Sequence, residues 1–321
     1  MLKNKKNAVI FSLIAMFLWG SAIPLIKSTY QVLQVESYDT FAKVYIAGIR
    51  FFMAGILAFF YAKIFGKNKI SFSKVNIKLV IILAILQTFL QYFFYYIGLS
   101  NTSGVKSSII QASNSFVIVI ISLFLLPEDK ISINTIIALI IGTTGIILVN
   151  SNQKMGSGFK LTGEGFIFTS TFINAFASVL LRKYSKNSDP YILNGMVLLF
   201  GSLPLIILGR FLYINPVVIN LKAFLMLFYG AFITATSFTI WTIVLQNHSA
   251  NQFGVFKLFI PIFGSILSVI ILGENFTIRL FIGLILVLTG SLVLMKGKNK
   301  KWCYRIINFF VTSFFMLNNT F

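Results

Sequence analysis

The sequence contains few of the side chains on which catalytic and metal sites usually depend. It has one cysteine, Cys303, one histidine, His248, and seven aspartates and glutamates among 321 residues. A single cysteine excludes an internal disulfide and a cysteine-based metal cluster, and a single histidine excludes a site built from several histidines. None of the acids lies in the middle of an apolar run. We therefore predict no catalytic site, metal or cofactor, and we expect that the chain is not an enzyme.

Charged residues of both signs are scarce. They make up 11% of the chain, whereas a soluble domain carries about 25%. Hydrophobic residues make up 57%, and the mean hydropathy is +0.90. Because no water-soluble core could bury this much apolar surface, we expect the lipid bilayer to be the solvent. The net charge of +20 does not indicate a nucleic-acid partner, since the basic residues lie in short loops between apolar runs.

Several apolar runs are long enough to cross the hydrocarbon core of a membrane, which takes about 20 residues of helix. We predict ten spans, over residues 8–27, 44–64, 78–98, 105–126, 132–149, 163–181, 191–213, 222–244, 252–272 and 278–295. The first follows a basic start, as in a signal peptide, but it is longer than such a core and lacks a cleavage site. The tail, residues 299–321, predicts an amphipathic interfacial helix. The alternative for the tail is an eleventh span.

One part of the chain repeats another. The stretch from Gly98 to Glu128 aligns without a gap with that from Val244 to Glu274, at an offset of 146 residues. Each copy is a short polar loop, a long apolar run and a terminal carboxylate. Internal repeats in membrane chains are typical of secondary transporters. We predict one five-helix repeat over residues 1–150 and a second over residues 151–298.

The distribution of basic residues predicts how the repeats lie in the membrane. With the N-terminus in the cytoplasm, 17 of the 27 lysines and arginines fall on the inside and eight on the outside, which fits the positive-inside rule. We therefore predict a plasma-membrane protein with both termini cytoplasmic. Five spans are an odd number, so the second repeat is inverted. The predicted fold is an all-α integral membrane protein with an inverted 5+5 repeat, an architecture suited to alternating access.

Polar side chains recur at helical spacing within the predicted spans, although such groups are costly at membrane depth. The sets are Gln87, Gln91 and Tyr95; Ser107, Gln111 and Asn114; Ser170, Asn174 and Ser178; and Thr234, Ser237 and Trp241. Small hydroxyl groups commonly bond between helices, but large amides need a shared polar space. We predict that Gln91, Tyr95, Gln111, Asn114 and Asn174 line a substrate cavity. Hydrogen bonding between packed helices is the alternative.

Lys257 is the sharpest candidate for a substrate contact. It lies inside the ninth predicted span and could act as a fixed cation for a carboxylate or phosphate. The alternative is that its long stem carries the ammonium out to the headgroups. Gln111 occupies the equivalent place in the first repeat. Pro261, one turn later, should leave a backbone carbonyl without a donor.

Trp19 and Trp241 also belong to the predicted binding site, with a place in the interfacial aromatic belt as the alternative. Arg50, within the second span, is the predicted gating residue, and direct contact with substrate is its alternative. The predicted latch partners of Arg50 are Glu36, Asp39 and Glu274.

The chain resembles the EamA branch of the drug/metabolite transporter superfamily. The matching pieces are Trp19-Gly20, Arg50-Phe51, Pro261 through Gly273-Glu274, and the glycines Gly142, Gly145, Gly283 and Gly290. The first repeat departs from the pattern, with Ser115 in place of Pro261 and Pro127 in place of Gly273. The resemblance implies a central cavity between spans 1–4 and 6–9. It also implies that spans 5 and 10 are packing elements or contacts of a homodimer.

The resemblance implies transport of metabolites or amino acids, mostly export. We therefore expect a secondary transporter of small polar or zwitterionic metabolites. An exporter of organic cations is the first alternative, although such proteins generally need a buried carboxylate, and no acid lies in the middle of a span. A membrane-embedded enzyme or a channel is a further alternative, for which the sequence offers no catalytic set, charged ring or carbonyl filter.

Overall fold

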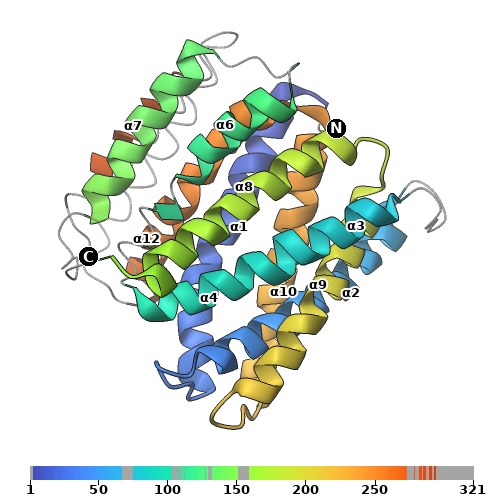
Figure 1. The fold of residues 1–321 in the computed structure, drawn as a ribbon, viewed down its shortest axis with the longest axis vertical. Helices are drawn as coiled ribbons and strands as arrows, with labels where there is room; N and C mark the ends of the chain where they lie inside the picture. Colours follow the sequence, from blue (N-terminus) through green and yellow to red (C-terminus); the bar gives the residue numbers. More distant parts are fainter. Residues whose placement is uncertain are drawn as a thin grey trace.

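The structure, a computed structural model, describes residues 3–66, 75–102, 107, 110–111, 113–126, 128, 132–150 and 159–272, with a few positions between 278 and 293. Within these residues the chain is helical and contains no strand (Figure 1). The predicted tail at 299–321 and most of the tenth predicted span lie outside the described residues.

The described helices coincide with the first nine predicted spans. They are α1 (Lys5–Val32), α2 (Thr40–Phe65), α3 (Ile77–Leu83), η2 (Ala84–Leu90), α4 (Gln91–Asn101), α6 (Asn114–Leu125), α7 (Ile133–Asn150), η3 (Leu161–Gly165), α8 (Phe166–Tyr184), α9 (Pro190–Leu212), α10 (Leu221–Asn247), α11 (Ala250–Gly254), η4 (Val255–Leu258) and α12 (Phe259–Leu272). Among the described residues, seven helical stretches are long and apolar enough to cross a membrane, and α6 and α7 contain shorter apolar helices. The count of ten and the inverted orientation stay predictions.

Short polar side chains fix where several helices begin. Asn4, Asp39, Asn76, Asp189 and Asn220 each stand at a helix N-cap, and the side-chain oxygen accepts a backbone N–H two or three residues on. Such a cap satisfies one of the donors that the first turn leaves unpaired. The helix starts are therefore set by local sequence, before any packing between helices.

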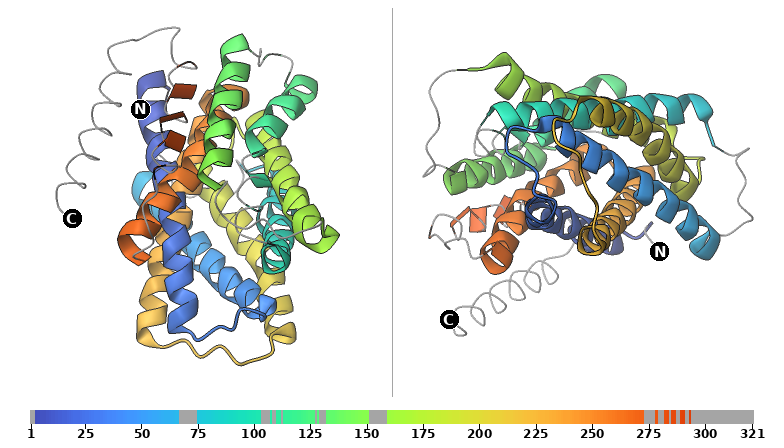
Figure 2. Two further views of the ribbon diagram at one scale, coloured as in Figure 1. Left: turned by 90° about the vertical axis from the view of Figure 1, so that its left-hand side faces the viewer. Right: turned by 90° about the horizontal axis from the view of Figure 1, so that it is seen from below.

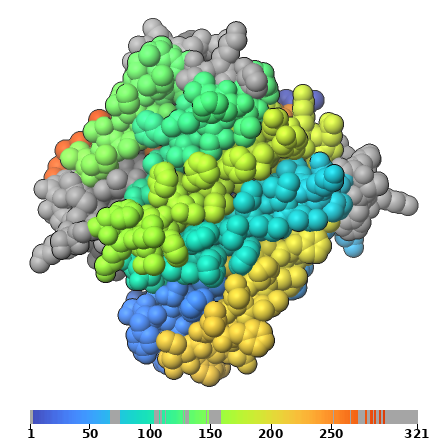
Figure 3. Space-filling model, viewed as in Figure 1, coloured from blue at the N-terminus to red at the C-terminus, as the bar shows by residue number. Residues whose placement is uncertain are grey.

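The outer surface is rich in apolar side chains. Phe124 on α6 is 79% exposed and Phe211 on α9 is 81% exposed, and many isoleucines and leucines beside them face outward as well. A soluble monomer rarely exposes a contiguous apolar surface of this kind. On the face shown in Figure 3, α6, α8 and the η2–α4 stretch lie side by side.

Several contacts between helices occur twice, once between two helices and once between their counterparts in the other predicted repeat. Helix α1 packs on both α10 and α12, and α8 packs on both α4 and α6, which are their counterparts. Likewise α10 packs on α2, while α9 packs on α3 and η2. The contact of α2 with α9, the second helices of the two predicted repeats, is the most extensive in the described part of the chain (Figures 1 and 2).

Glycines allow α2 and α9 to approach closely. A Cβ at Gly55 would lie 2.9 Å from the backbone nitrogen of Leu199 and 3.0 Å from the carbonyl oxygen of Gly195. A Cβ at Gly209 would lie 2.6 Å from the backbone nitrogen of Tyr45. Close backbone contact through small residues is a common way to hold helices together in a membrane. This crossing therefore joins the two predicted repeats.

Candidate functional site

Lys257 lies where the ninth predicted span is interrupted. The chain passes from α11 into the 3-10 turn η4, which contains Lys257, and then into α12. Pro261 has no N–H to donate to the carbonyl of Lys257 four residues earlier, and its ring crowds that carbonyl. The helix tightens, and the N–H of Phe259 is shared between the carbonyls of Phe256 and Lys257. Pro261 therefore removes the α-helical donor of the Lys257 carbonyl, as predicted, and this carbonyl keeps only a share of the Phe259 N–H.

The ammonium of Lys257 points into the protein. Its Nζ donates to Oδ1 of Asn174 at 2.6 Å, to Oγ of Ser178 at 3.2 Å and to Oδ1 of Asn114 at 3.3 Å. These partners come from α8 and α6. The alternative in which the lysine stem carries its charge out to the headgroups does not describe this conformation.

The amides around Lys257 continue into a larger network. Asn174 uses its Nδ2 to donate to Oε1 of Gln91 at 2.9 Å. Asn114 uses its Nδ2 to donate to the Thr171 carbonyl at 2.9 Å and to Oδ1 of Asn174 at 3.1 Å. Ser178 had been placed on the Asn174 face of its span by helical spacing, but not among the predicted binding residues. We define the Lys257 cluster as Lys257, Asn114, Asn174, Ser178 and Gln91.

Two tryptophans form an aromatic wall beside the cluster. The Lys257 Nζ lies 5.3 Å from the ring centroid of Trp241, within the range of a cation–π contact. The rings of Trp241 and Trp19 meet edge to face at 6.1 Å, and Trp19 contacts Phe238 in the same way at 5.3 Å. Trp241 is 3% exposed, so its ring is enclosed by protein in this conformation. Its indole Nε1 is buried and has no hydrogen-bond partner among the described residues.

Tyr95 and Gln111 lie together next to the cluster. Tyr95 follows Gln91 by one turn of α4, and its hydroxyl lies beside the side chain of Gln111. Gln111 Nε2 also donates to Ser107 Oγ at 3.1 Å. At the offset of 146 residues, Tyr95 corresponds to Trp241 and Gln111 to Lys257. The structure thus brings together eight of the nine predicted site residues, all except Arg50.

The charge of Lys257 is not matched by an acid. Among the residues that the structure describes, no carboxylate forms an ion pair with this ammonium, and its three hydrogen-bond acceptors are neutral. The same part of the chain holds no group of three or more histidines, cysteines and acids that could bind a metal ion. The cluster can therefore attract an anionic group and present amide oxygens to an ammonium group.

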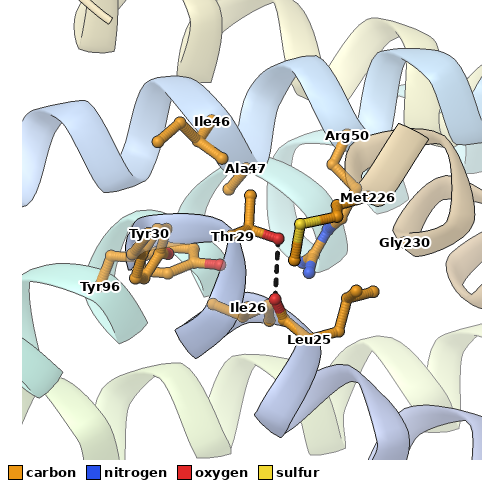
Figure 4. A pocket seen from close by; sticks show the side chains of 10 residues that line it. All are labelled: Leu25, Ile26, Thr29, Tyr30, Ile46, Ala47, Arg50, Tyr96, Met226 and Gly230. Carbon is orange, nitrogen blue, oxygen red and sulfur yellow. Dashed lines mark hydrogen bonds between the residues drawn. The ribbon is translucent and has the colours of Figure 1, made fainter. Parts of the chain in front are cut away.

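Arg50 lies in a separate pocket, which shares no residue with the Lys257 cluster (Figure 4). Its side chain is 7% exposed and lies over the ring of Phe51. Of its predicted latch partners, Asp39 instead accepts backbone N–H groups of Ala42, Ile214 and Asn215. Glu36 is exposed, and Glu274 lies outside the described residues. The structure therefore does not bring Arg50 together with Asp39 in a latch.

Comparison with known proteins places this arrangement in context. The profile of the EamA-like transporter family matches residues 6–151 and again residues 161–296. The uncharacterized transporter YetK of Bacillus subtilis is 25% identical over 312 residues, which cover 95% of this chain and 91% of that protein. A probable amino-acid metabolite efflux pump of Escherichia coli is 21% identical over 306 residues, covering 92% and 96%. A crystal structure with 17% identity has the same fold, with a TM-score of 0.77 over 94% of this chain and 99% of its own.

Proposed function

Because the chain belongs to the EamA-like transporter family, we propose that it is a secondary transporter that exports small polar or zwitterionic metabolites, including amino acids. Its apolar helices and its family make it a multi-pass membrane protein. The family and the relatives named as transporters also point to a transporter rather than an enzyme. We place it in the plasma membrane with both termini cytoplasmic.

The observation that carries the proposal is the unpaired ammonium of Lys257 inside a cluster of amides. A cargo carboxylate would bind this ammonium and replace some of its neutral acceptors with a charge-assisted hydrogen bond, which is about twice as strong. The ammonium end of a zwitterion would donate hydrogen bonds to the amide oxygens of Asn174 and Gln91. The aromatic wall of Trp241 and Trp19 would pack against the apolar part of the cargo. The name of the Escherichia coli relative, which mentions amino-acid metabolites, agrees with this cargo class.

Alternating access is the mechanism that the packing supports. The Lys257 cluster joins η4 to α6 and α8, and Ser115 Oγ on α6 donates to the Gly254 carbonyl on α11 at 3.0 Å. These contacts link segments of the two predicted repeats at the cargo site. If α1 with its neighbours and α8 with its neighbours exchanged their packing arrangements, the site would open first to one side of the membrane and then to the other.

An exporter of organic cations is the second candidate, and the aromatic wall is the observation that favours it. Tryptophan faces bind quaternary ammonium groups well. However, the fixed charge at this site is positive, and none of the acids that the structure describes contacts the Lys257 ammonium. We therefore rank small anions and zwitterions above hydrophobic cations.

Counterflow in liposomes tests the proposal. Purified protein is reconstituted into vesicles loaded with an unlabelled amino acid, and uptake of the labelled amino acid is measured across a panel that includes organic cations. We expect saturable counterflow for a zwitterionic or anionic compound. Counterflow restricted to organic cations would favour the second candidate. Lipid-transferase turnover without counterflow for any compound would contradict a transporter.

A further inference from the structure

We propose that the pocket of Arg50 is a second binding site, which takes one small anionic group, either an inorganic anion such as chloride or a single carboxylate. The pocket lies between α1, α2, α4 and α10. Arg50, Thr29, Tyr30, Tyr96 and Met226 line it, together with apolar side chains of α1 and α2. Because its lining does not overlap the Lys257 cluster, this site goes beyond the proposed cargo site and stands or falls separately from it.

Arg50 is a buried cation whose hydrogen-bonding capacity is not filled. Its side chain is 7% exposed, and its Nε is buried and has no hydrogen-bond partner among the described residues. Within the same residues no acid forms an ion pair with it. The face of Phe51, 4.8 Å from Cζ, offers only a cation–π contact. A buried charge without a partner costs several kcal/mol, so an anion beside Arg50 would be bound favourably.

The other polar groups of the pocket are placed to donate to such an anion. Figure 4 shows Arg50 and Met226 on one side of the space, Tyr30 and Tyr96 on the other, and Thr29 between them. The hydroxyls of Tyr30 and Tyr96 lie close to each other, and a tyrosine hydroxyl can donate its hydrogen to a ligand. The Thr29 hydroxyl donates to the Leu25 carbonyl at 2.7 Å. Thr29 therefore limits the space rather than supplying a donor.

The size and the remaining lining select the ligand. The pocket is partly open, and its enclosed space has about the volume of one water molecule. It therefore takes a monatomic anion, or one oxygen of a carboxylate whose remaining atoms lie at the opening, but not a whole metabolite. Leu25, Ile26, Ile46 and the Met226 side chain are apolar and strengthen electrostatic attraction by excluding water. A cation is disfavoured because the charge at the site is positive. The charge of Arg50 and the size of the pocket therefore favour chloride, or the carboxylate end of a molecule that enters from one side.

Direct binding measurements test this site without any transport assay. Purified protein in chloride-free sodium HEPES is titrated with sodium chloride or sodium acetate at constant ionic strength, since the HEPES anion is too large for the pocket. Thermal unfolding midpoints and broadening of the chloride NMR line are recorded for the wild type, R50Q and R210Q. Arg210 is the matched control, because it also lies over an aromatic ring, that of Tyr213, but is exposed.

We expect the anion to raise the unfolding midpoint of the wild type and R210Q, and R50Q to bind it at least tenfold more weakly. M226F, which fills the pocket and keeps Arg50, should lose the same response and covers the case in which R50Q does not fold. A response to chloride as well as acetate identifies an inorganic-anion site, and a response to acetate alone identifies a carboxylate site. Equal responses in R50Q, M226F and the wild type would overturn the proposal. It would also be overturned if the wild type showed no response and E274Q gained one, because Glu274 would then already neutralise Arg50.

Discussion

Lys257 can donate hydrogen bonds but cannot accept them, and this property orients the amides around it. Asn114 and Asn174 both turn their Oδ1 atoms toward its Nζ, at 3.3 Å and 2.6 Å. Their Nδ2 atoms are thereby directed outward, to the Thr171 carbonyl and to Oε1 of Gln91. One charged side chain therefore organises polar groups from α4, α6 and α8.

Replacing Lys257 by glutamine should weaken binding of an anionic or zwitterionic cargo. The lost charge-assisted hydrogen bonds are worth about 1.5–3 kcal/mol, which corresponds to roughly a 10- to 100-fold loss of affinity. Folding should persist, because glutamine occupies the equivalent position 111 in the first repeat. The half-saturation concentration of counterflow measures the loss. K222Q, at an exposed lysine of α10, is the control, and an equal effect of both substitutions would count against a cargo role for Lys257.

Replacing Asn174 by aspartate should have a similar effect through the opposite change. The new carboxylate would stand where Oδ1 now lies, 2.6 Å from the Lys257 Nζ, and would neutralise the ammonium at the site. We expect loss of anionic cargo binding and unchanged or higher thermal stability. N247D, near the exposed end of α10, is the control. Unchanged binding of an anionic cargo by N174D would show that the Lys257 charge does not select cargo.

The sequence predicted which polar positions matter here better than it predicted their partners. Helical spacing placed Gln91 with Tyr95, and Asn174 with Ser178, on common faces, because that relation is local. The bond between Lys257 and Asn174 joins residues 83 apart in the chain, and only the packing of η4 on α8 and α6 creates it. The pocket around Arg50 escaped prediction for the same reason. Tyr30 and Tyr96 stand in apolar runs, and neither carries a sequence signal that associates it with Arg50.

At the scale of the element, the 3-10 turn η4 is the local structure that positions Lys257. Replacing Pro261 by alanine restores the N–H that an α-helix would donate to the Lys257 carbonyl. We expect a continuous α-helix, an equal or higher unfolding midpoint and reduced counterflow, because Lys257 would rotate away from Asn174. P204A, at a proline within α9, should leave counterflow unchanged. Full activity of P261A would show that the turn is not required.

The crossing of α2 and α9 should tolerate no larger residue at Gly55. A valine there would press on the backbone of Leu199 and Gly195, and overpacking typically costs about 1–3 kcal/mol. We expect a lower thermal unfolding midpoint, measured as the temperature at which half of the folded peak is lost in size-exclusion chromatography of heated samples. I56V, on the neighbouring residue, which is 52% exposed, should behave as the wild type. An unaltered midpoint for G55V would mean that this crossing is not tightly packed.

Apolar length predicted where the helices lie, and polar caps such as Asp39 and Asn220 agree with where they begin. The π-helical turns η2 and η3 were not predicted. The turn η2 connects α3 to α4, and the turn η3 leads directly into α8. Neither helical stretch contains a proline. Their hydrogen-bond pattern depends on packing against neighbouring helices, which a single chain read in order does not reveal.

At the scale of the whole molecule, the paired helix contacts provide a common frame on which the two repeats differ. At the offset of 146 residues, Tyr95 corresponds to Trp241 and Gln111 to Lys257. In the proposed mechanism, such a frame exchanges two arrangements of similar energy, and the side chains that differ between the repeats select the cargo. Alternating access therefore requires that the space beside Lys257 be reachable from each side of the membrane in turn.

Accessibility of a cysteine at position 111 tests this requirement most directly. Gln111 is exposed and contacts Tyr95 beside the cluster, and the single native cysteine, Cys303, can be replaced by serine. In vesicles of known orientation, Q111C in the C303S background is treated with a membrane-impermeant maleimide from one side or the other. We predict labelling from both sides, slowed in each case by cargo. Labelling from one side only, unaffected by any cargo, would contradict alternating access at this site.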